Sequence, residues 1–175
     1  PFEYIKKGLE KVTVPGRAEV LDIKKDYTVM IDYAHSPDSL ENILTTVKAY
    51  APGRVVCVFG CGGDRDKTKR PIMGRISGQL ADFTIITSDN PRTEDPDAII
   101  RDIEEGIKQT GGLYTTITDR REAIKYALMN AKPKDIILLA GKGHETYIIL
   151  KDKTIHFDER EVVRDILKEL DSGNN

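Results

Sequence analysis

Residues 83–97, FTIITSDNPRTEDPD, contain a strand-like segment, a polar loop and the start of a helix. Phe83–Thr87 has the apolar, β-branched character of a buried strand. Asp95 stands directly before a proline, as an N-cap stands before a first helical residue. A strand that passes through a loop into a helix is the repeating unit of α/β proteins. The loop also holds Asp89 and Arg92, an acid and a base that a turn alone does not require.

The rest of the chain repeats this alternation of strand-like and helix-like segments. We expect strands at Ala18–Ile23, Tyr27–Asp32, Arg54–Phe59, Phe83–Thr87, Thr115–Thr118, Ile136–Ala140, Tyr147–Leu150 and Thr154–Phe157. We expect helices over 37–51, Pro71–Leu80, Pro96–Lys108, Arg120–Ala131 and after Asp158, with caps at Ser36, Asp95, Asp119 and Asp158. The pattern predicts an α/β, Rossmann-like three-layer sandwich. Its sheet is mostly parallel, with helices on both faces and an antiparallel closing hairpin.

The composition is typical of a globular domain and excludes several classes of protein. The chain has 175 residues, of which 32% are charged and 39% hydrophobic, and its net charge is −2. Basic residues form no block, so neither nucleic acid nor a membrane surface is an expected partner. No apolar run approaches the ~20 residues of a membrane span. Cys57 and Cys61 are expected to be reduced thiols of a cytoplasmic protein, because C-x3-C without a second pair is a poor zinc signal.

Unusual polar segments follow four of the predicted strands. Parallel strands with right-handed crossovers place their carboxyl ends on one edge of the sheet, where ligands bind in open α/β folds. These four segments are therefore expected to meet there. They are DYAHSPD (Asp32–Asp38), GCGGDRDKTKRP (Gly60–Pro71), SDNPR (Ser88–Arg92) and GKGHE (Gly141–Glu145).

The glycines in these loops match no complete nucleotide-binding motif. GCGG fails as a dinucleotide fingerprint, because G-x-G-x-x-G would require glycine where Arg65 stands. No G-x-x-x-x-G-K-[ST] phosphate loop occurs in the sequence. Residues 60, 62 and 63 are glycines that either form a tight turn or serve the site directly. His35 and His144 have no nucleophile beside them, so acid–base catalysis by histidine is not expected.

The charges in the four loops suit a ligand that carries both signs. Arg65 and Arg92 would lie on neighbouring loops, and two guanidinium groups can each donate a pair of parallel hydrogen bonds to carboxylate or phosphate. Asp89 and Glu145 on the same edge could hold an ammonium group. Together these residues predict a site for a zwitterion such as an amino acid.

Four motifs, in order, resemble the C-terminal domain of the Mur ligases of peptidoglycan synthesis. They are DYAHSPDSL, VFGCGGDRDKTKRPIMG, SDNPRTEDP and LLAGKGHE, and the resemblance extends from Val14–Glu19 to the last helix. It implies an ATP-dependent ligase that forms an acyl phosphate, which the amine of an incoming amino acid attacks. The D-N-P-R motif is similar to that of members that add meso-2,6-diaminopimelate to UDP-MurNAc-L-Ala-D-Glu.

The resemblance also implies a role for individual residues, none of them catalytic. The residues expected to bind diaminopimelate are Arg65, Asp89, Asn90, Arg92, Gly141 and Glu145, and those expected on the nucleotide side are Arg17, Asp32 and His35. ATP and Mg2+ would be bound mainly by another domain. Diaminopimelate differs from lysine by a distal carboxylate, so rejecting lysine requires a cation that lysine would leave unpaired. Arg92 is expected to be that cation.

Residues 1–175 are therefore expected to form a single amino-acid-binding domain of such a ligase. We expect the N-terminal UDP-sugar domain and the central ATPase domain to lie outside this piece, and we expect this piece alone to be inactive. Two alternatives stay open. The chain could be a stand-alone module that binds a zwitterionic amino acid, or part of a sister ligase that adds lysine, a dipeptide, glutamate on folate, or another diamino acid such as lanthionine.

Overall fold

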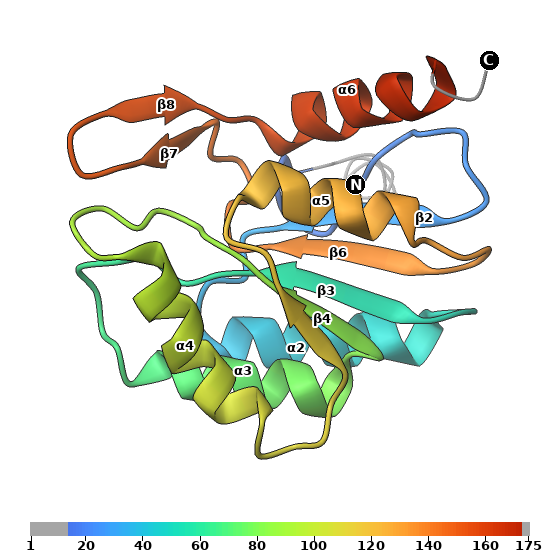
Figure 1. Cartoon of the computed structure of the whole chain (residues 1–175). Helices are drawn as coiled ribbons and strands as arrows, with labels where there is room; N and C mark the ends of the chain where they lie inside the picture. Colours follow the sequence, from blue (N-terminus) through green and yellow to red (C-terminus); the bar gives the residue numbers. More distant parts are fainter. Residues whose placement is uncertain (1–13, 173–175) are drawn as a thin grey trace, which may run out of the picture.

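A computed structural model describes residues 14–172, and its centre is a six-stranded sheet in the order β1-β2-β6-β3-β4-β5 (Figure 1). The strands are β1 (Glu19–Val20), β2 (Thr28–Asp32), β3 (Val55–Phe59), β4 (Phe83–Ile86), β5 (Tyr114–Thr116) and β6 (Ile136–Ala140). A separate hairpin contains β7 (Tyr147–Ile149) and β8 (Thr154–His156). The helices are α2 (Pro37–Tyr50), α3 (Lys69–Leu80), α4 (Pro96–Ile107), α5 (Arg120–Met129) and α6 (Glu159–Ser172). The predicted fold class is confirmed.

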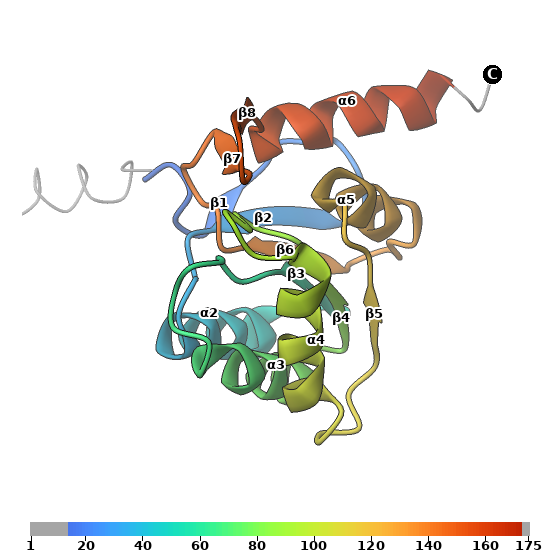
Figure 2. The ribbon, with the colours of Figure 1, turned by 60° about the vertical axis from the view of Figure 1, so that its left-hand side comes forward.

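The direction in which the chain crosses the sheet decides which face each helix covers. Strands β2, β3, β4, β5 and β6 pair in parallel, and β1 pairs antiparallel to β2. Right-handed crossovers from β2 to β5 place α2, α3 and α4 on one face. The chain then returns through α5 to insert β6 between β2 and β3, so α5 lies on the opposite face together with α6 (Figure 2).

Alternate residues of the central strands enter two separate hydrophobic cores. Val55, Cys57 and Phe59 of β3 face the core under α2, α3 and α4. Val56 and Val58 face the core under α5 and α6. A strand buried on both faces reads as a continuous apolar run, which is why VVCVF was recognisable in the sequence.

The predicted caps are present at the helix starts. Ser36 forms a reciprocal capping box with Ser39 at the start of α2. The carboxylates of Asp95 and Asp119 accept hydrogen bonds from the first turns of α4 and α5. Asp158 Oδ1 accepts from the backbone of Arg160 in the first turn of α6. Each cap satisfies backbone groups that the helix itself leaves unpaired.

One predicted strand is wrong in its extent, and one helix starts two residues earlier than expected. The strand expected at 18–23 is only Glu19–Val20: Ala18, with a left-handed φ of 44°, turns the chain before it, and Lys24, with φ of 53°, turns the chain again a few residues beyond it. Helix α3 begins at Lys69 and not at Pro71, because Thr68 already turns the chain by donating its backbone N–H to Asp66. The other expected ends agree to within about two residues, the usual uncertainty of such boundaries.

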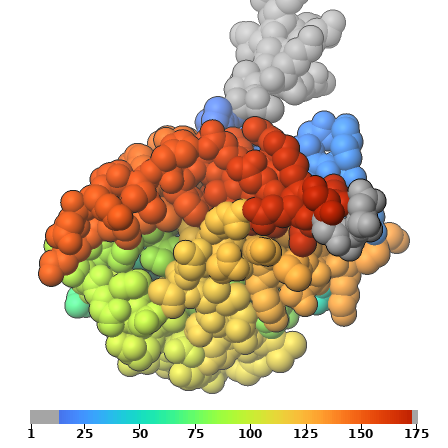
Figure 3. Space-filling model, turned by 45° about the horizontal axis from the view of Figure 1, so that its top comes forward, coloured from blue at the N-terminus to red at the C-terminus, as the bar shows by residue number. Residues whose placement is uncertain are grey.

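The C-terminal segment lies beside α5 on the same face of the sheet. Figure 3 shows the β7–β8 hairpin and α6 as one continuous orange and red band across this side of the molecule. The hairpin also touches the loop after β4, because the backbone N–H of Arg92 donates to the carbonyl of Ile149. Among residues 14–172, no helix is both long enough and apolar enough to cross a membrane.

A fully buried ion pair connects α5 and α6 to the carboxyl ends of two strands. Arg120 donates to Glu159 Oε1 at 2.9 Å, to the carbonyl of Ala140 at 2.9 Å and to that of Ser88 at 3.2 Å. Ala140 ends β6, and Ser88 follows β4. Burial raises the pKa of Glu159, while the charge and hydrogen bonds of Arg120 oppose that rise. One guanidinium therefore fixes three elements near the edge where the polar loops begin.

We expect Arg120→Met to destabilise the chain by about 3–5 kcal/mol, because it leaves a buried carboxylate without its cation. Urea unfolding followed by circular dichroism measures this difference. Arg121→Met is the matched control, since Arg121 pairs with Glu169 on the surface and its loss should have a much smaller effect. Equal effects of the two substitutions would contradict this account of the buried pair.

Candidate functional site

A cavity of about 350 Å³ opens at the carboxyl edge of the sheet, where β2, β6, β3 and β4 end side by side. The connections after β2, β3 and β4 cross one face of the sheet, whereas the chain after β6 continues to α6 on the other face, so the loops diverge at this point and leave space between them. Loops from all four strands contribute to the wall. The lining residues are Tyr33, His35, Gly60, Cys61, Gly62, Arg65, Asp66, Lys69, Asp89, Asn90, Arg92, Gly141 and Glu145.

The structure brings most of the predicted site residues together. All six that were expected to bind diaminopimelate line this cavity, and so does His35. Arg17 and Asp32 do not line it and lie beside it, next to Tyr33. The predicted convergence of the four loops is therefore observed, and the ligand roles of the residues stay a prediction.

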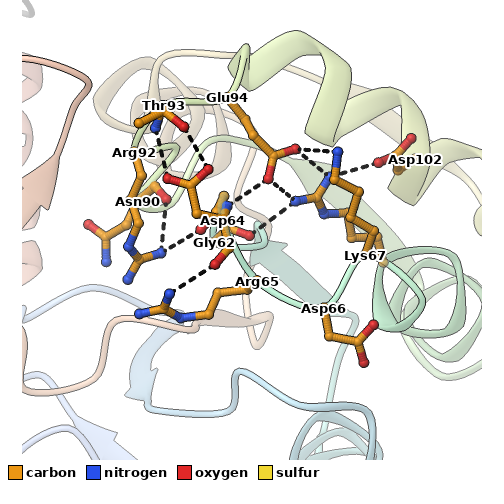
Figure 4. A network of polar contacts seen from close by, with 12 residues as sticks. Gly62, Asp64, Arg65, Asp66, Lys67, Asn90, Arg92, Thr93, Glu94 and Asp102 are labelled. Carbon is orange, nitrogen blue, oxygen red and sulfur yellow. Dashed lines mark hydrogen bonds and ion pairs between the residues drawn. The ribbon is translucent and has the colours of Figure 1, made fainter.

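The basic side of the cavity is formed by Arg65 and Arg92, whose guanidinium groups lie on the same side of two paired loops (Figure 4). Arg92 Nη1 donates to the carbonyls of Gly63 at 2.9 Å and Asn90 at 3.4 Å. Arg65 Nη1 donates to the carbonyl of Asp64 at 2.9 Å. Within residues 14–172, only one nitrogen of each guanidinium donates a hydrogen bond. The remaining N–H groups are available to a carboxylate or phosphate.

The two loops that carry these arginines pack closely. A Cβ at Gly63 would lie 1.9 Å from the carbonyl oxygen of Pro91, so only glycine permits this approach. A Cβ at Gly62 would lie 2.8 Å from Arg92 Nη1. Asp64 accepts hydrogen bonds from the backbone N–H and hydroxyl of Thr93. Gly63 is thus explained by packing, whereas Gly62 leaves room for the guanidinium of Arg92.

A buried arginine, Arg70, holds the same two loops together. It donates to Glu94 at 2.9 and 3.1 Å, to Asp102 at 2.8 Å and to the carbonyl of Gly62 at 3.3 Å. Glu94 also accepts from the backbone N–H of Asp64 at 2.6 Å. The hydrogen bonds from Arg70 are the main reason why the pKa of Glu94 falls to about 2. Sequence reasoning assigned no role to Arg70 or Glu94.

The acidic side contains a residue that the sequence analysis missed. Lys142 is fully buried, and its Nζ lies 3.5 Å from Glu145 Oε2 and 3.8 Å from Asp89 Oδ1. Burial lowers the pKa of Lys142, and the two carboxylates oppose that shift. The predicted ammonium-binding pair therefore already contacts an ammonium that belongs to the chain. The only available signal was a lysine placed between two glycines directly after a buried strand.

Asn90 connects the acidic side to the hairpin. Its Nδ2 donates to Glu145 Oε2 at 2.9 Å, and its Oδ1 accepts from the backbone N–H of Ile149 at 2.9 Å and from Lys142 at 3.3 Å. Both ends of this buried amide are engaged within the protein. This geometry favours a role in positioning Glu145 over direct contact with a ligand.

The residues expected on the nucleotide side form a second group around Tyr33. The guanidinium carbon of Arg17 lies 4.7 Å from the centre of the Tyr33 ring, and the ring of His35 lies 4.5 Å from it. Asp32 Oδ2 accepts from the backbone N–H of Ala18 at 2.7 Å, which anchors the turn that carries Arg17. Arg17 and His35 are exposed, so both can reach a negatively charged group at this edge.

The cysteines are unreactive residues of the core. Cys57 and Cys61 are free and buried, as expected for reduced thiols. Burial is the main cause that raises the pKa of each thiol to about 12, so both stay protonated at neutral pH. In the described part of the chain, no three histidine, cysteine or acidic side chains gather in a way that could hold a metal ion.

The chain is similar to a defined family and to named ligases. Residues 16–143 match the family described as Mur ligase, glutamate ligase domain. A protein of Caldanaerobacter subterraneus subsp. tengcongensis, named UDP-N-acetylmuramoyl-L-alanyl-D-glutamate--2,6-diaminopimelate ligase, is 57% identical over 169 residues; the match covers 97% of this chain and 35% of that protein. A protein of the same name from Clostridium botulinum is 54% identical over 173 residues, with the same coverage. The chain thus spans 35% of the length of these curated relatives.

Solved structures show the same arrangement of helices and strands. A UDP-N-acetylmuramoyl-L-alanyl-D-glutamate--2,6-diaminopimelate ligase superposes with a TM-score of 0.84 at 41% identity, over 92% of this chain and 33% of that chain. The UDP-N-acetylmuramate-alanine ligase of Thermotoga maritima superposes with a TM-score of 0.63 at 21% identity, over 94% and 32%. At 21% identity, the likeness to the Thermotoga maritima ligase shows only that the two chains share a fold.

Glu94→Gln should lower the free energy of unfolding near neutral pH, and this difference from the unsubstituted chain should disappear in acid. Because the pKa of Glu94 is depressed from 4.5 to about 2, its stabilising contribution is complete above pH 4.5 and is lost as the pH falls through about 2. Urea unfolding of both proteins between pH 7 and about pH 2 measures the difference. Glu105→Gln, on the exposed side of α4, is the control. A difference that does not change with pH would contradict the proposed charge network.

Proposed function

Because the chain belongs to the Mur ligase family, as its glutamate ligase domain, we propose that it binds the incoming amino acid of an ATP-dependent ligase and that this amino acid is meso-2,6-diaminopimelate. The relatives at 57% and 54% identity are named for this amino acid, which supports the assignment. The whole ligase would join diaminopimelate to UDP-MurNAc-L-Ala-D-Glu. This product is a precursor of peptidoglycan.

One observation carries the proposal: carboxylates and guanidinium groups with unused donors line a single cavity. Arg65 and Arg92 retain donors for a carboxylate, and Glu145 faces the same space. Diaminopimelate has a carboxylate and an ammonium at each end, whereas lysine lacks the distal carboxylate. In a site that holds Arg92 in place, lysine would leave a desolvated cation without its partner, which disfavours lysine binding.

In this proposal, the chain's own residues orient the nucleophile. ATP, when bound by the whole ligase together with a divalent ion such as Mg2+, supplies the activation of the substrate carboxylate as an acyl phosphate. Arg65 and Arg92 would hold the distal carboxylate, so that the reacting amine at the other end points out of the cavity. Such positioning converts a reaction between separate molecules into one between neighbouring groups.

The nucleotide side is proposed to lie at the Tyr33 group. Arg17 and His35 are exposed donors, which fits a phosphate chain held between this edge and another part of the ligase. Asp32 would act through the backbone of the Arg17 turn, because one of its oxygens already accepts from Ala18.

The domain assignment is also a proposal. Residues 1–175 would be the single C-terminal domain, and the remainder of the parent ligase would supply the UDP-sugar and ATPase domains. The share of the relatives that the chain covers, 35%, agrees with one domain of a larger enzyme. The chain alone would then bind diaminopimelate weakly and would not turn it over.

In the full ligase that contains this chain, Arg92→Ala should reduce kcat/KM for diaminopimelate by about 10- to 150-fold, the effect of losing a charge-assisted pair. The KM for ATP should stay within about twofold, because Arg92 lies on the amino-acid side of the cavity. The preference for diaminopimelate over lysine should fall in parallel. Steady-state kinetics with both amino acids measures these changes.

Arg75→Ala is the control, since Arg75 is exposed on α3 away from the cavity lining. An unchanged preference between diaminopimelate and lysine in Arg92→Ala would refute the proposed role. A wild-type ligase that prefers lysine would refute the proposed substrate itself.

A further inference from the structure

Lys142 contributes a positive charge within the acidic side of the cavity, although no part of it reaches water. It follows Gly141 at the end of β6, and the left-handed φ of 113° at Gly141 directs the chain inward. A buried ammonium is unfavourable unless its three donors find acceptors. A buried ammonium beside a ligand cavity therefore requires an explanation in terms of its contacts.

The ammonium donates hydrogen bonds to two side-chain oxygens and forms an ion pair with a third. They are Asn90 Oδ1 at 3.3 Å, Glu145 Oε2 at 3.5 Å and Asp89 Oδ1 at 3.8 Å. Asp89 and Asn90 come from the loop after β4, and Glu145 comes from the loop after β6. The single cation thus holds the two loops that form the acidic wall.

Other charged groups around Lys142 are already paired. Glu159 of α6 and Arg120 of α5 form their own ion pair, and the ring of Tyr147 in β7 lies 6.0 Å from the ammonium. The two carboxylates that face Lys142 therefore share one positive charge. One net negative charge remains at this wall of the cavity.

The contacts also distinguish the two carboxylates. Both hydrogen bonds to Glu145 within the described residues, from Asn90 and from Lys142, end on Oε2, so Oε1 is left for a ligand. Among the described residues, the carboxylate of Asp89 accepts no hydrogen bond; its Oδ1 lies 3.8 Å from Lys142 Nζ, and its Oδ2 would lie 2.8 Å from a Cβ added at Gly141. Both acids line the cavity, but Glu145 is hydrogen-bonded in one direction, whereas Asp89 is attracted to the lysine by charge alone.

We propose that Lys142 is a positioning residue that sets both the direction of Glu145 and the net charge of the wall, so that the wall accepts one ligand ammonium. Asp89 then balances the charge of Lys142. This inference rests on the proposed function, because the ligand is taken to be an amino acid with a free ammonium group. The expectation that Asp89 and Glu145 hold the ammonium together stays a prediction, and the following test decides it.

The test is a charge-compensation cycle in the full ligase, with Lys142→Met, Asp89→Asn and the double variant. Lys142→Met should raise KM for diaminopimelate about 10- to 100-fold with kcat and the KM for ATP within about threefold, because two carboxylates then face each other without a cation. Asp89→Asn should also raise KM, because the wall becomes neutral. The double variant restores one net negative charge, so its KM should return to within about threefold of wild type.

If Lys142 and Asp89 had purely structural roles, the two increases in KM would multiply in the double variant. If Asp89 bound the ligand directly, the double variant would have the highest KM of the three variants. Either result would overturn the proposal. Lys151→Met, in the exposed turn of the hairpin, is the matched lysine control. Thermal unfolding reports whether each variant folds. If Lys142→Met does not fold, the double variant must still bind diaminopimelate more tightly than Asp89→Asn does.

A crystal structure of the 175-residue chain with Lys142→Met separates this inference from the proposed function. The carboxylates of Asp89 and Glu145 should move apart, and the contact between Asn90 and Glu145 should be lost. Both carboxylates in their wild-type positions would refute the inference whatever amino acid the ligase uses. A wild-type ligase that rejects diaminopimelate would refute only the substrate, and the cycle would then be measured with the amino acid that is used.

Discussion

Three buried cations hold the loops at the carboxyl edge of the sheet, and the geometry of the candidate site depends on them. Within residues 14–172, these are the buried lysine and arginine side chains. Arg70 joins the loop after β3 to that after β4, Arg120 joins the ends of β4 and β6 to α6, and Lys142 joins the loops after β4 and β6. Parallel strands bring four polar loops to one place, and carbonyls and carboxylates that face each other there repel unless a cation lies between them.

These internal cations leave the outer charges free to bind a ligand. Arg65 and Arg92 each use one nitrogen to donate to loop carbonyls, and both residues line the cavity. The acid nearest to both loops, Glu94, is already paired with Arg70 and Lys67. The division between structural and free charges thus explains how so many charged residues share one edge and still leave donors available to a ligand.

The sequence predicted the order of elements, the two-faced core and the convergence of the loops, because these follow from local patterns and from the handedness of crossovers. It did not predict the buried cations. Arg70 contacts Glu94, and Lys142 contacts Asn90, across many intervening residues, and neither contact leaves a periodic signal. Lysine and arginine side chains are also mostly exposed in proteins, so their residue type alone predicts a position on the surface. The length of β1 was mispredicted because a left-handed alanine cannot be inferred from residue type.

Backbone strain at the site is consistent with a cavity that is shaped before a ligand arrives. Arg92 and Asp64 both have left-handed backbones, with φ of 51° and 54°, which are unfavourable for residues other than glycine. A hydrogen bond to another segment holds each of these residues in place. The backbone N–H of Arg92 donates to the carbonyl of Ile149 in β7, and the carboxylate of Asp64 accepts from the hydroxyl of Thr93 in the loop after β4. The free-energy cost of this backbone strain is therefore met when the chain folds, before any ligand binds. A ligand that binds between Arg92 and Glu145 then needs to order few groups, and preorganisation of this kind favours discrimination between amino acids that differ by one carboxylate.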